Sequence, residues 1–446
     1  MSRLRVERFD GLQQLRLLAG VVDAVNVSSA SWSPFHTSAF LIQYAIHSEF
    51  FPEGLIPYVY IAFSGDDPIG TLVTRRQHVS FAPRLGYTRI DFLATHDNDH
   101  CGVVAKAGCE VEVTMAILAH LTREKGWALV EFRGQELQSL LRPLARDIRS
   151  ARVRVREVPL VPFEKVSLHW NDMGAYFSSL SKRMRSNVSR QTRHLYAAGN
   201  VQLAFASGGQ AVGALFESFC DLENRSWKAG TEASMQRHPK RKAFYAEVAA
   251  GNAGLDPSFV GVVLDGVLIA GLINGSGGGH TWSLEMAFDQ RYADLGPGQL
   301  LLLLTVGEAI HSGSKSLRFF QHHDYFKKRW LSEPTEAVNV QLIRTCSLMG
   351  LQALGGDAIR AVRRRRSPDG LRAETRSEEP GLEVAGAAIE SSTVDSGTGT
   401  STISRTSESL GVISFAEVVC AAGSGLRVVD AIHAAHLLPF SIHAKG

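Results

Sequence analysis

The chain has few of the residues that staple small secreted domains or ligate structural metals. Its 446 residues include five cysteines, which are scattered, odd in number and never spaced as Cys-x-x-Cys. This pattern predicts neither a disulfide framework nor a zinc ribbon, and it is typical of a reducing compartment. The first residues are polar, and no apolar run approaches the roughly 20 residues that span a bilayer. We therefore expect a cytoplasmic protein without a transmembrane segment.

An excess of charge of one sign is also missing. The chain has 47 basic and 44 acidic residues and a formal net charge of +3, which is too small to indicate DNA binding by itself. Hydrophobic residues make up 45% of the chain, enough to supply the cores of two domains or more. The function must therefore be sought in local motifs.

The most informative motif is a glycine-containing loop at 289–299, directly before the apolar run 300–306. Its glycines open into a predicted helix, where free backbone N–H groups at a positive helix end can hold a phosphate or pyrophosphate. We expect the loop to bind a nucleotide-tailed donor, such as an acyl-coenzyme A, through Leu295, Gly296, Gly298 and Gln299. A glycine turn before an ordinary core helix is the alternative, because a short Gly-x-Gly is not specific.

The elements around this loop predict an α+β fold class. Strands are expected at 259–264 and 267–273, joined by a tight turn at Asp265-Gly266, and again at 280–288 and 316–321. A helix is expected from 299 to 311, ended by Gly313. Three antiparallel strands, a loop, a helix and a further strand form one compact unit.

The first half of the chain repeats this order of elements. Strands are expected at 58–63, 68–73, 90–93 and 127–132, with a helix over 110–125. The repeat predicts tandem domains at 1–160 and 161–350. Because the first copy has no Gly-x-Gly before its helix, we assign donor binding to the second copy.

A segment from 176 to 195 predicts one amphipathic helix with a basic outer face. Its apolar residues fall in one stripe, and five cations, among them Arg185 and Arg190, occupy the rest of the wheel. These cations could bind a phosphate-bearing acceptor such as a nucleotide sugar or a lipid-linked sugar. A solvated face with scattered ion pairs remains the alternative.

Several motifs together resemble a known superfamily. They are Tyr176-Phe-x-x-Leu180-x-Lys182-Arg-x-Arg185-x-Asn187-x-x-Arg190, Ser226-Trp227-Lys228, Phe244-Tyr245, the 289–298 loop and Asp324-Tyr-Phe-Lys-Lys-Arg-Trp330. In this order they resemble the GCN5-related N-acetyltransferase (GNAT) superfamily. More specifically, they resemble the acetyltransferase-like family linked to bacterial cellulose and exopolysaccharide synthesis, which is similar to the Fem-type transferases.

The resemblance implies tandem acyl-CoA N-acyltransferase domains, each a mixed, mainly antiparallel sheet flanked by helices. It also implies acetyl-CoA as donor, no metal, and substrate binding by Arg185, Asn187 and Arg190, which match motif positions. The function that follows is transfer of an acetyl or other acyl group to an amine or hydroxyl of a carbohydrate-related acceptor in exopolysaccharide or envelope synthesis.

Acyl transfer needs a base for the nucleophile and an acid for the leaving thiolate. Glu285 on the strand before the loop is the candidate base if burial raises its pKa, and its alternative is a carboxylate facing solvent. Asp324 is expected to orient the acceptor and Tyr325 to protonate the thiolate, while Lys327 or Lys328 neutralises phosphate.

Two polar segments and two other functions stay open. The cluster His96, Asp97, Asp99, His100 and Cys101 contains metal-ligand types, but a surface loop is the preferred interpretation. Residues 351–446 are expected to be mostly a disordered tail, with an arginine run at 363–366. A Fem-like transferase using aminoacyl-tRNA is one alternative function. A non-catalytic accessory of a polysaccharide synthase complex is the other, and Pro297 favours it by removing an amide from the loop.

Overall fold

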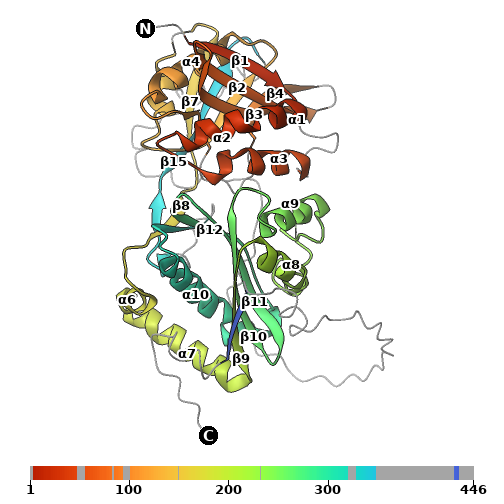
Figure 1. The fold of residues 1–446 in the computed structure, drawn as a ribbon, viewed down its shortest axis with the longest axis vertical. Coiled ribbons are helices and arrows are strands. Elements are labelled where there is room, and N and C mark those ends of the chain that lie inside the picture. The colour runs from red at the N-terminus through yellow and green to blue at the C-terminus, as the bar shows by residue number, and fades with distance from the viewer. Residues whose placement is uncertain are drawn as a thin grey trace, which may run out of the picture. The chain divides into compact units, whose positions relative to one another are not determined.

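The computed structural model describes residues 4–47, 56–82, 85–93, 101–148, 150–231, 233–319, 328–347 and 426–430. The loop at 96–100, Asp324, Tyr325, Lys327 and the arginine run at 363–366 lie outside these ranges, so the expectations for them stay predictions. Two mixed, mainly antiparallel sheets with flanking helices make up the described part, which confirms the α+β fold class (Figure 1).

The first sheet has the strand order β1-β2-β3-β4-β6-β15-β7, with β5 paired to β3. Only β4 and β6 in this order run parallel. The strands are β1 (Arg5–Asp10), β2 (Pro57–Ser64), β3 (Asp67–Ala82), β4 (Leu85–Phe92), β5 (Val104–Ala105), β6 (Leu129–Glu136), β7 (Val153–Pro159) and β15 (Ala337–Arg344).

The second sheet has the order β14-β8-β13-β12-β11-β10-β9-β16. Here β12 and β13 form the parallel pair. The strands are β8 (Phe163–Ser167), β9 (Val201–Ser207), β10 (Asp256–Leu264), β11 (Val267–Gly277), β12 (His280–Phe288), β13 (Ser316–Phe319), β14 (Glu333–Thr335) and β16 (Leu426–Asp430).

The internal repeat is visible in the pairing of both sheets. The order β2-β3-β4-β6 matches β10-β11-β12-β13, each with two antiparallel pairs and then a parallel one. Even the irregularity after the first hairpin recurs, because Ile69 and Ile269 are the skipped residues of equivalent β-bulges. Asp265 and Gly266 form the predicted turn with φ of 49° and 77°. The repeated order of elements expected from the sequence is confirmed, while the bounds 1–160 and 161–350 stay a prediction.

Helices cover both faces of each sheet. In the first sheet, successive side chains of β2 point to opposite faces. Val59 and Ile61 pack with α1 to α3, while Tyr60 and Ala62 pack with α4. The second sheet lies between α8 and α9 on one face and α6, α7 and α10 on the other (Figure 1). The helices are α1 (Leu12–Leu17), α2 (Ala19–Val27), α3 (Ser38–His47), α4 (Glu110–Arg123), α5 (Leu141–Arg146), α6 (Met173–Ser179), α7 (Lys182–Ala198), α8 (Gly209–Glu223), α9 (Pro239–Ala249) and α10 (Pro297–His311).

The prediction of one helix over 176–195 is wrong, because α6 and α7 are separate. Leu180 is extended, with φ −64° and ψ 155°, and Ser181 then caps α7 by accepting a hydrogen bond from the Met184 N–H at 3.2 Å. A serine inside a helical pattern competes for the backbone in this way. The apolar stripe is nevertheless buried as expected, since Tyr176 and Leu195 are both 0% exposed.

The two copies exchange strands. β15, which follows the second copy in the chain, lies between β6 and β7 of the first sheet. β8, which precedes the second copy, pairs with β13 and β14 of the second sheet. Each sheet therefore depends on chain from beyond its own repeat to satisfy the backbone N–H and C=O groups of its parallel strand.

One hydrophobic core is shared between the copies. Phe40 and Tyr44 of α3 make edge contacts with Phe244 of α9, at ring-centroid distances of 5.5 and 5.7 Å. Phe35, from the short 3-10 helix η1 (Pro34–His36), contacts Trp282 of β12 at 5.0 Å. These contacts fix the first copy against β12 and α9.

The described residues contain no helix that is both long and apolar enough to cross a bilayer. In the same ranges no group of three or more His, Cys, Asp or Glu side chains is placed to hold a metal ion. The cysteines at 101, 109, 220 and 346 are free thiols.

We predict that Leu342→Ala destabilises the whole chain by about 2–5 kcal/mol, the usual cost of removing a buried leucine side chain. Leu342 is fully buried in the core of the first sheet although it lies on β15. Urea unfolding would measure the change. Leu17→Ala is the control, because Leu17 is 71% exposed and its truncation should cost less than about 0.5 kcal/mol. Equal effects of the two variants would show that β15 is not part of the core.

Candidate functional site

Within the described residues, which stop at Phe319, the parallel pairing of β12 and β13 covers four residues on each strand. It runs from His280 opposite Ser316 to Ser283 opposite Phe319, while β12 continues to Phe288. Directly after Ser283, Leu284 is the skipped residue of a β-bulge against β11. Bulges often lie next to active sites, where they redirect side chains. The second half of β12, with Glu285 and the loop that follows, is therefore the first candidate site.

The loop is more closed than the sequence predicts. It forms a short 3-10 helix, η2 (Gln290–Leu295), and then turns at Gly296, whose φ is +66°, into α10. The Gly296 N–H donates to the Ala293 carbonyl, and the Gln299 N–H donates to the Gly296 carbonyl, both at 3.0 Å. Pro297 has no N–H. The expected row of open amides is thus wrong for Gly296 and Gln299, and Gly298, the second residue of α10, is itself buried.

Close packing explains both glycines. A Cβ on Gly296 would lie 2.4 Å from Cδ of Gln191 on α7, and a Cβ on Gly298 would lie 3.2 Å from Cε of Met286 on β12. Gly296 also needs its left-handed conformation. These glycines bring α7 and β12 against the start of α10, a structural requirement that a Gly-x-Gly pattern does not distinguish from phosphate binding.

Three predicted site residues meet at the start of α10. Asn187 donates from Nδ2 to Oε1 of Gln299 at 2.9 Å, and Arg190 donates from Nη2 to Oδ1 of Asn187 at 3.1 Å. Arg185 is not part of this group, because its guanidinium donates to the carbonyls of Ser178 and Leu180 at the end of α6. The structure therefore brings together Gln299, expected to bind the donor, with Asn187 and Arg190, expected to bind the acceptor. Arg185 instead binds the carbonyl groups at the end of α6.

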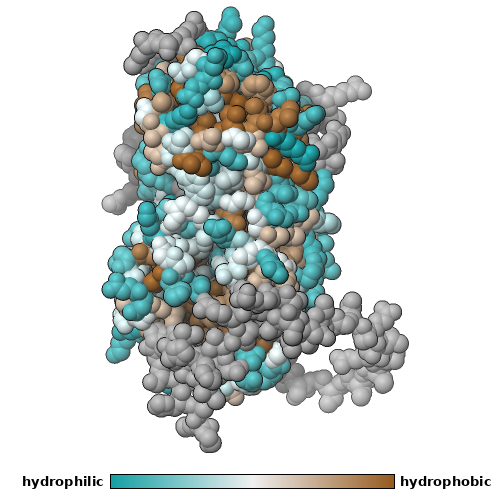
Figure 2. All heavy atoms as spheres, viewed as in Figure 1, coloured by the Kyte–Doolittle hydropathy of each residue, from teal (hydrophilic) through white to brown (hydrophobic). Residues whose placement is uncertain are grey.

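Exposed cations form a stripe on α7. Lys182, Arg183, Arg190 and Arg193 are exposed and lie within about 100° of one another around the helix. None of them forms an ion pair with a carboxylate in the part of the chain that the structure describes. Figure 2 shows hydrophilic side chains bordering α7, whereas hydrophobic ones gather over α1 to α3. The stripe next to the Gln299 contact suits an anionic ligand.

Asp289 fixes the path from β12 into η2. Its carboxylate is 0% exposed and accepts hydrogen bonds from the Arg291 N–H at 3.0 Å and from Arg225 Nε at 2.9 Å. Burial alone would raise the pKa of Asp289, but the bonds from Arg291 and Arg225 outweigh it and lower the pKa to about 2. This aspartate is a charged anchor for the loop.

Glu285 belongs to a buried group of four charges. Its carboxylate, 3% exposed, is bonded to Lys228 and Arg241, and Lys228 Nζ also lies 3.5 Å from Oε1 of Glu223. Burial tends to raise the pKa of Glu285, yet the two cations dominate and the pKa is lowered. Burial raises the pKa of Glu223. Our expectation of a raised pKa at Glu285 is therefore wrong, because the sequence did not reveal the two cations that face it.

A carboxylate that stays ionised between two cations is a weak proton acceptor. What Glu285 does in this geometry is hold the segment between α8 and α9 onto β12. Trp227, in the same segment, packs against Phe288 at a centroid distance of 4.7 Å, with the two rings tilted by 40°, and remains 41% exposed. The cluster thus positions an exposed tryptophan beside the start of the loop. Lys228 lies in a motif visible in sequence, whereas Glu223 and Arg241 carry no signal that separates them from surface charges.

A cleft of about 730 Å³ is the second candidate site. Its walls come from α4 and the end of β6 in the first copy and from the starts of β12 and β13 in the second, and it lies where the first copy's own parallel pair ends. The size is that of a small-molecule site. Sequence reasoning missed it, because its walls are more than a hundred residues apart. Its lining includes Ser31, Trp32, His36, Glu110, Thr114, Gln135, Glu136, Ser139, His280, Trp282, Lys315 and Arg318.

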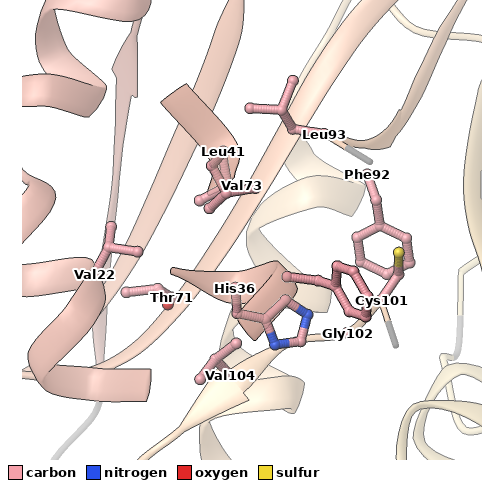
Figure 3. Close-up of a pocket in the computed structure, with 11 residues that line it drawn as sticks. Val22, His36, Leu41, Thr71, Val73, Phe92, Leu93, Cys101, Gly102 and Val104 are labelled. Carbon is pink, nitrogen blue, oxygen red and sulfur yellow. The ribbon is translucent and has the colours of Figure 1, made fainter. Parts of the chain in front are cut away.

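A much smaller cavity of about 20 Å³ adjoins this cleft, enough for about one water molecule. Figure 3 shows the His36 ring beside Gly102 and the Cys101 thiol near Phe92, among apolar side chains. His36 and Cys101 line both spaces. The small cavity is therefore an apolar recess behind the larger cleft.

We predict that Glu285→Gln lowers the free energy of unfolding by about 3–5 kcal/mol, because it leaves two partly buried cations without their shared anion. Urea unfolding at neutral pH would measure the loss. Glu217→Gln is the matched control, since Glu217 is 68% exposed in its pair with Lys242 and should cost less than about 1 kcal/mol. A stable Glu285→Gln protein that loses only turnover would instead identify a general base.

Asp289→Asn should destabilise the protein by about 1–3 kcal/mol at pH 7, because hydrogen bonds to two arginines lose their charged acceptor. A lowered pKa contributes stability above the ordinary value of 3.8, and that contribution disappears as the pH falls toward the folded value of about 2. The gap between wild type and variant in urea midpoints should therefore narrow from pH 7 to pH 3. Asp67→Asn is the control, because Asp67 pairs with Lys106 but its side chain is 59% exposed, so its urea midpoint should differ little from that of wild type. A gap between wild type and Asp289→Asn that stays constant with pH would refute the lowered pKa of Asp289.

Comparison with known proteins finds a similarity in the second copy. Residues 182–328 match the family described as an acetyltransferase (GNAT) domain, and no curated protein sequence matches the chain. Among solved structures, FemX is similar at 12% identity and a TM-score of 0.49, covering 73% of this chain and 96% of its own. A tandem GNAT protein from the clavulanic acid biosynthesis pathway shows 14% identity and a TM-score of 0.42, covering 76% and 98%. The C-terminal domain of a putative lysylphosphatidylglycerol synthetase from Agrobacterium fabrum shows 10% identity and a TM-score of 0.45. The match covers 78% of this chain and 97% of that domain's chain. Residues 182–328, about a third of the chain, are thus similar to GNAT acetyltransferase domains.

Proposed function

We propose that the second copy transfers an acyl group, in particular acetyl, from acyl-CoA to an amine or hydroxyl of a carbohydrate-related acceptor. The observation that carries this proposal is the GNAT-matched segment in which a short parallel pair, a bulge at Leu284 and a loop into α10 follow one another. In the reaction, the acceptor nitrogen or oxygen bonds to the thioester carbonyl carbon and loses a proton. The C–S bond breaks, and the leaving thiolate takes up a proton.

The donor's phosphates are assigned to the start of α10. We assign this role to Gly298 and to the positive end of α10, because the helix dipole favours an anion there. Arg190 lies next to it, oriented by Asn187, which Gln299 holds. A side-chain cation thus supports a loop that has lost most of its amide donors. Leu295 and Gly296 shape this turn.

Of the groups expected from sequence to act on the acceptor and the leaving group, those near residues 324–327 remain, while Glu285 does not serve as the base. Tyr325 as the acid for the thiolate, Asp324 as the group that orients the acceptor, and Lys327 as a phosphate ligand are proposals on residues outside the described ranges. Glu285 supports the site by keeping Trp227 and its segment on β12. Removal of the acceptor's proton is then assigned to solvent or to a group near Asp324.

One observation favours a different function. The internal hydrogen bonds of Gly296 and Gln299, together with Pro297, leave a weaker phosphate cradle than a row of free amides. A non-catalytic accessory of a polysaccharide synthase complex would need no donor there. A transferase with an aminoacyl-tRNA donor would instead use the cation stripe of α7.

Isothermal titration of the full chain with acetyl-CoA tests the proposal. We expect saturable binding, with Arg190→Ala weakening it about tenfold, the loss expected for one charge-assisted phosphate contact of about 1.4 kcal/mol. Arg193→Ala is the matched control. It removes an exposed cation from the same helix, but Arg193 bonds the Ser189 carbonyl and has no link to Gln299.

If no heat of binding is measured at an acetyl-CoA concentration of about 1 mM, the result would contradict a CoA donor. It would favour the accessory function or the tRNA-dependent function. Binding that Arg190→Ala and Arg193→Ala weaken equally would contradict the specific role of Arg190 while leaving the donor class intact. Release of free CoA in the presence of amine and hydroxyl acceptors would then report transfer.

A further inference from the structure

We propose that the 730 Å³ cleft binds a zwitterionic ligand, an amine that also carries an anionic group such as a phosphate or carboxylate. The further statement that this ligand is the acceptor of acyl transfer rests on the proposed function. The inference deepens that function by naming the kind of acceptor and by placing it in the cleft of the first copy rather than on α7.

The cleft has an acidic wall and a basic wall. Glu110, at the start of α4, and Glu136, at the end of β6, belong to the first copy, while Lys315 and Arg318 belong to the second. Arg318 and Glu136 lie 3.9 Å apart, so the two walls meet at that pair. Glu110 and Lys315 form no ion pair with any residue that the structure describes. Among the described residues, one carboxylate and one ammonium of this cleft are therefore without an ion-pair partner.

The charges select against simpler ligands. A ligand with only an anionic group would be attracted by Lys315 but repelled by the two carboxylates. A ligand with only an amine would be attracted by the carboxylates but repelled by the cations on the other wall, such as Arg318. A molecule with both groups pairs with both walls, so specificity comes from repulsion as well as attraction. The lining also contains hydroxyl groups from Ser31, Thr114 and Ser139 and amide groups from Gln135 and Gln138, which suit a hydroxylated ligand such as an amino sugar.

The cleft is rigid and close to the second copy's β12. Trp32 of its rim lies against the β11–β12 turn so tightly that a Cβ on Gly278 would come within 2.7 Å of the indole. Trp282 of its floor is 1% exposed and precedes Ser283, where the described pairing with β13 ends. A ligand in the cleft therefore lies beside the strand that leads to the loop and to α10.

Three matched probes test the charge requirement by isothermal titration of the full chain. Glucosamine 6-phosphate carries both groups, glucosamine lacks the anion, and glucose 6-phosphate lacks the amine. We expect the first to bind at least about tenfold more tightly than either of the others, a difference of about 1.4 kcal/mol.

Variants then assign each charge to its wall. Glu110→Gln should remove the preference for the amine, so that glucosamine 6-phosphate binds like glucose 6-phosphate. Lys315→Ala should remove the preference for the phosphate. Glu112→Gln is the control for the first, because it lies in the same exposed turn of α4 but outside the cleft lining, and Lys125→Ala is the control for the second.

Equal binding of the three probes, no binding of any, or unchanged affinities in Glu110→Gln and Lys315→Ala would each overturn the proposal. Titration of the same samples with acetyl-CoA separates it from the proposed function. Acetyl-CoA binding without probe binding refutes the zwitterion site alone. Probe binding with the expected variant effects but without acetyl-CoA binding supports the site and refutes the CoA donor.

Discussion

The reciprocal exchange of β8 and β15 is the constraint on which the rest of this structure depends. A parallel strand next to an unpaired edge would leave its backbone N–H and C=O groups without partners, and here each such strand is covered by chain from beyond its own repeat. Because the exchange runs in both directions, neither sheet is complete without the other copy's flanking segment. The shared core of Phe40, Phe244 and Trp282 then forms at the place where the copies meet.

This constraint also makes the cleft. An acidic wall on α4 and β6 and a basic wall beside β13 come from different copies, and their spacing is set by strands that cross between the sheets. Glu110 is half-buried and Lys315 is exposed, and neither has an ion-pair partner among the described residues. The exchange of strands thus brings charges of opposite sign from the two copies to one cleft.

Charge is used differently in the second copy. Glu285 and Asp289 lie four residues apart around the end of β12, and both are buried, ionised and held by cations. They anchor the α8–α9 segment and η2 on either side of the strand, so the loop and Trp227 are held in fixed positions. The second copy thus has a fixed scaffold around the start of α10, where Asn187 links Arg190 to Gln299.

The sequence by itself determined the elements whose signals are local. The hairpin at Asp265-Gly266, the strand 280–288, the helix after the glycine loop and the order that repeats them in the first half are written in turn residues and in period-2 or period-3.6 patterns. The burial of Tyr176 and Leu195 followed from the same periodicity, although the break at Ser181 did not, because a capping hydroxyl looks like any polar residue in a helical pattern.

Only the tertiary structure decided what those elements do together. The partners of Glu285 come from residues 228 and 241, the bonds that close the loop depend on the turn geometry of Gly296, and the walls of the cleft come from residues about 200 apart in the chain. Patterns of apolar and polar residues specify which face of an element is buried. They do not specify which distant charge that face meets, because pairing across a fold depends on topology and register rather than on sequence neighbours.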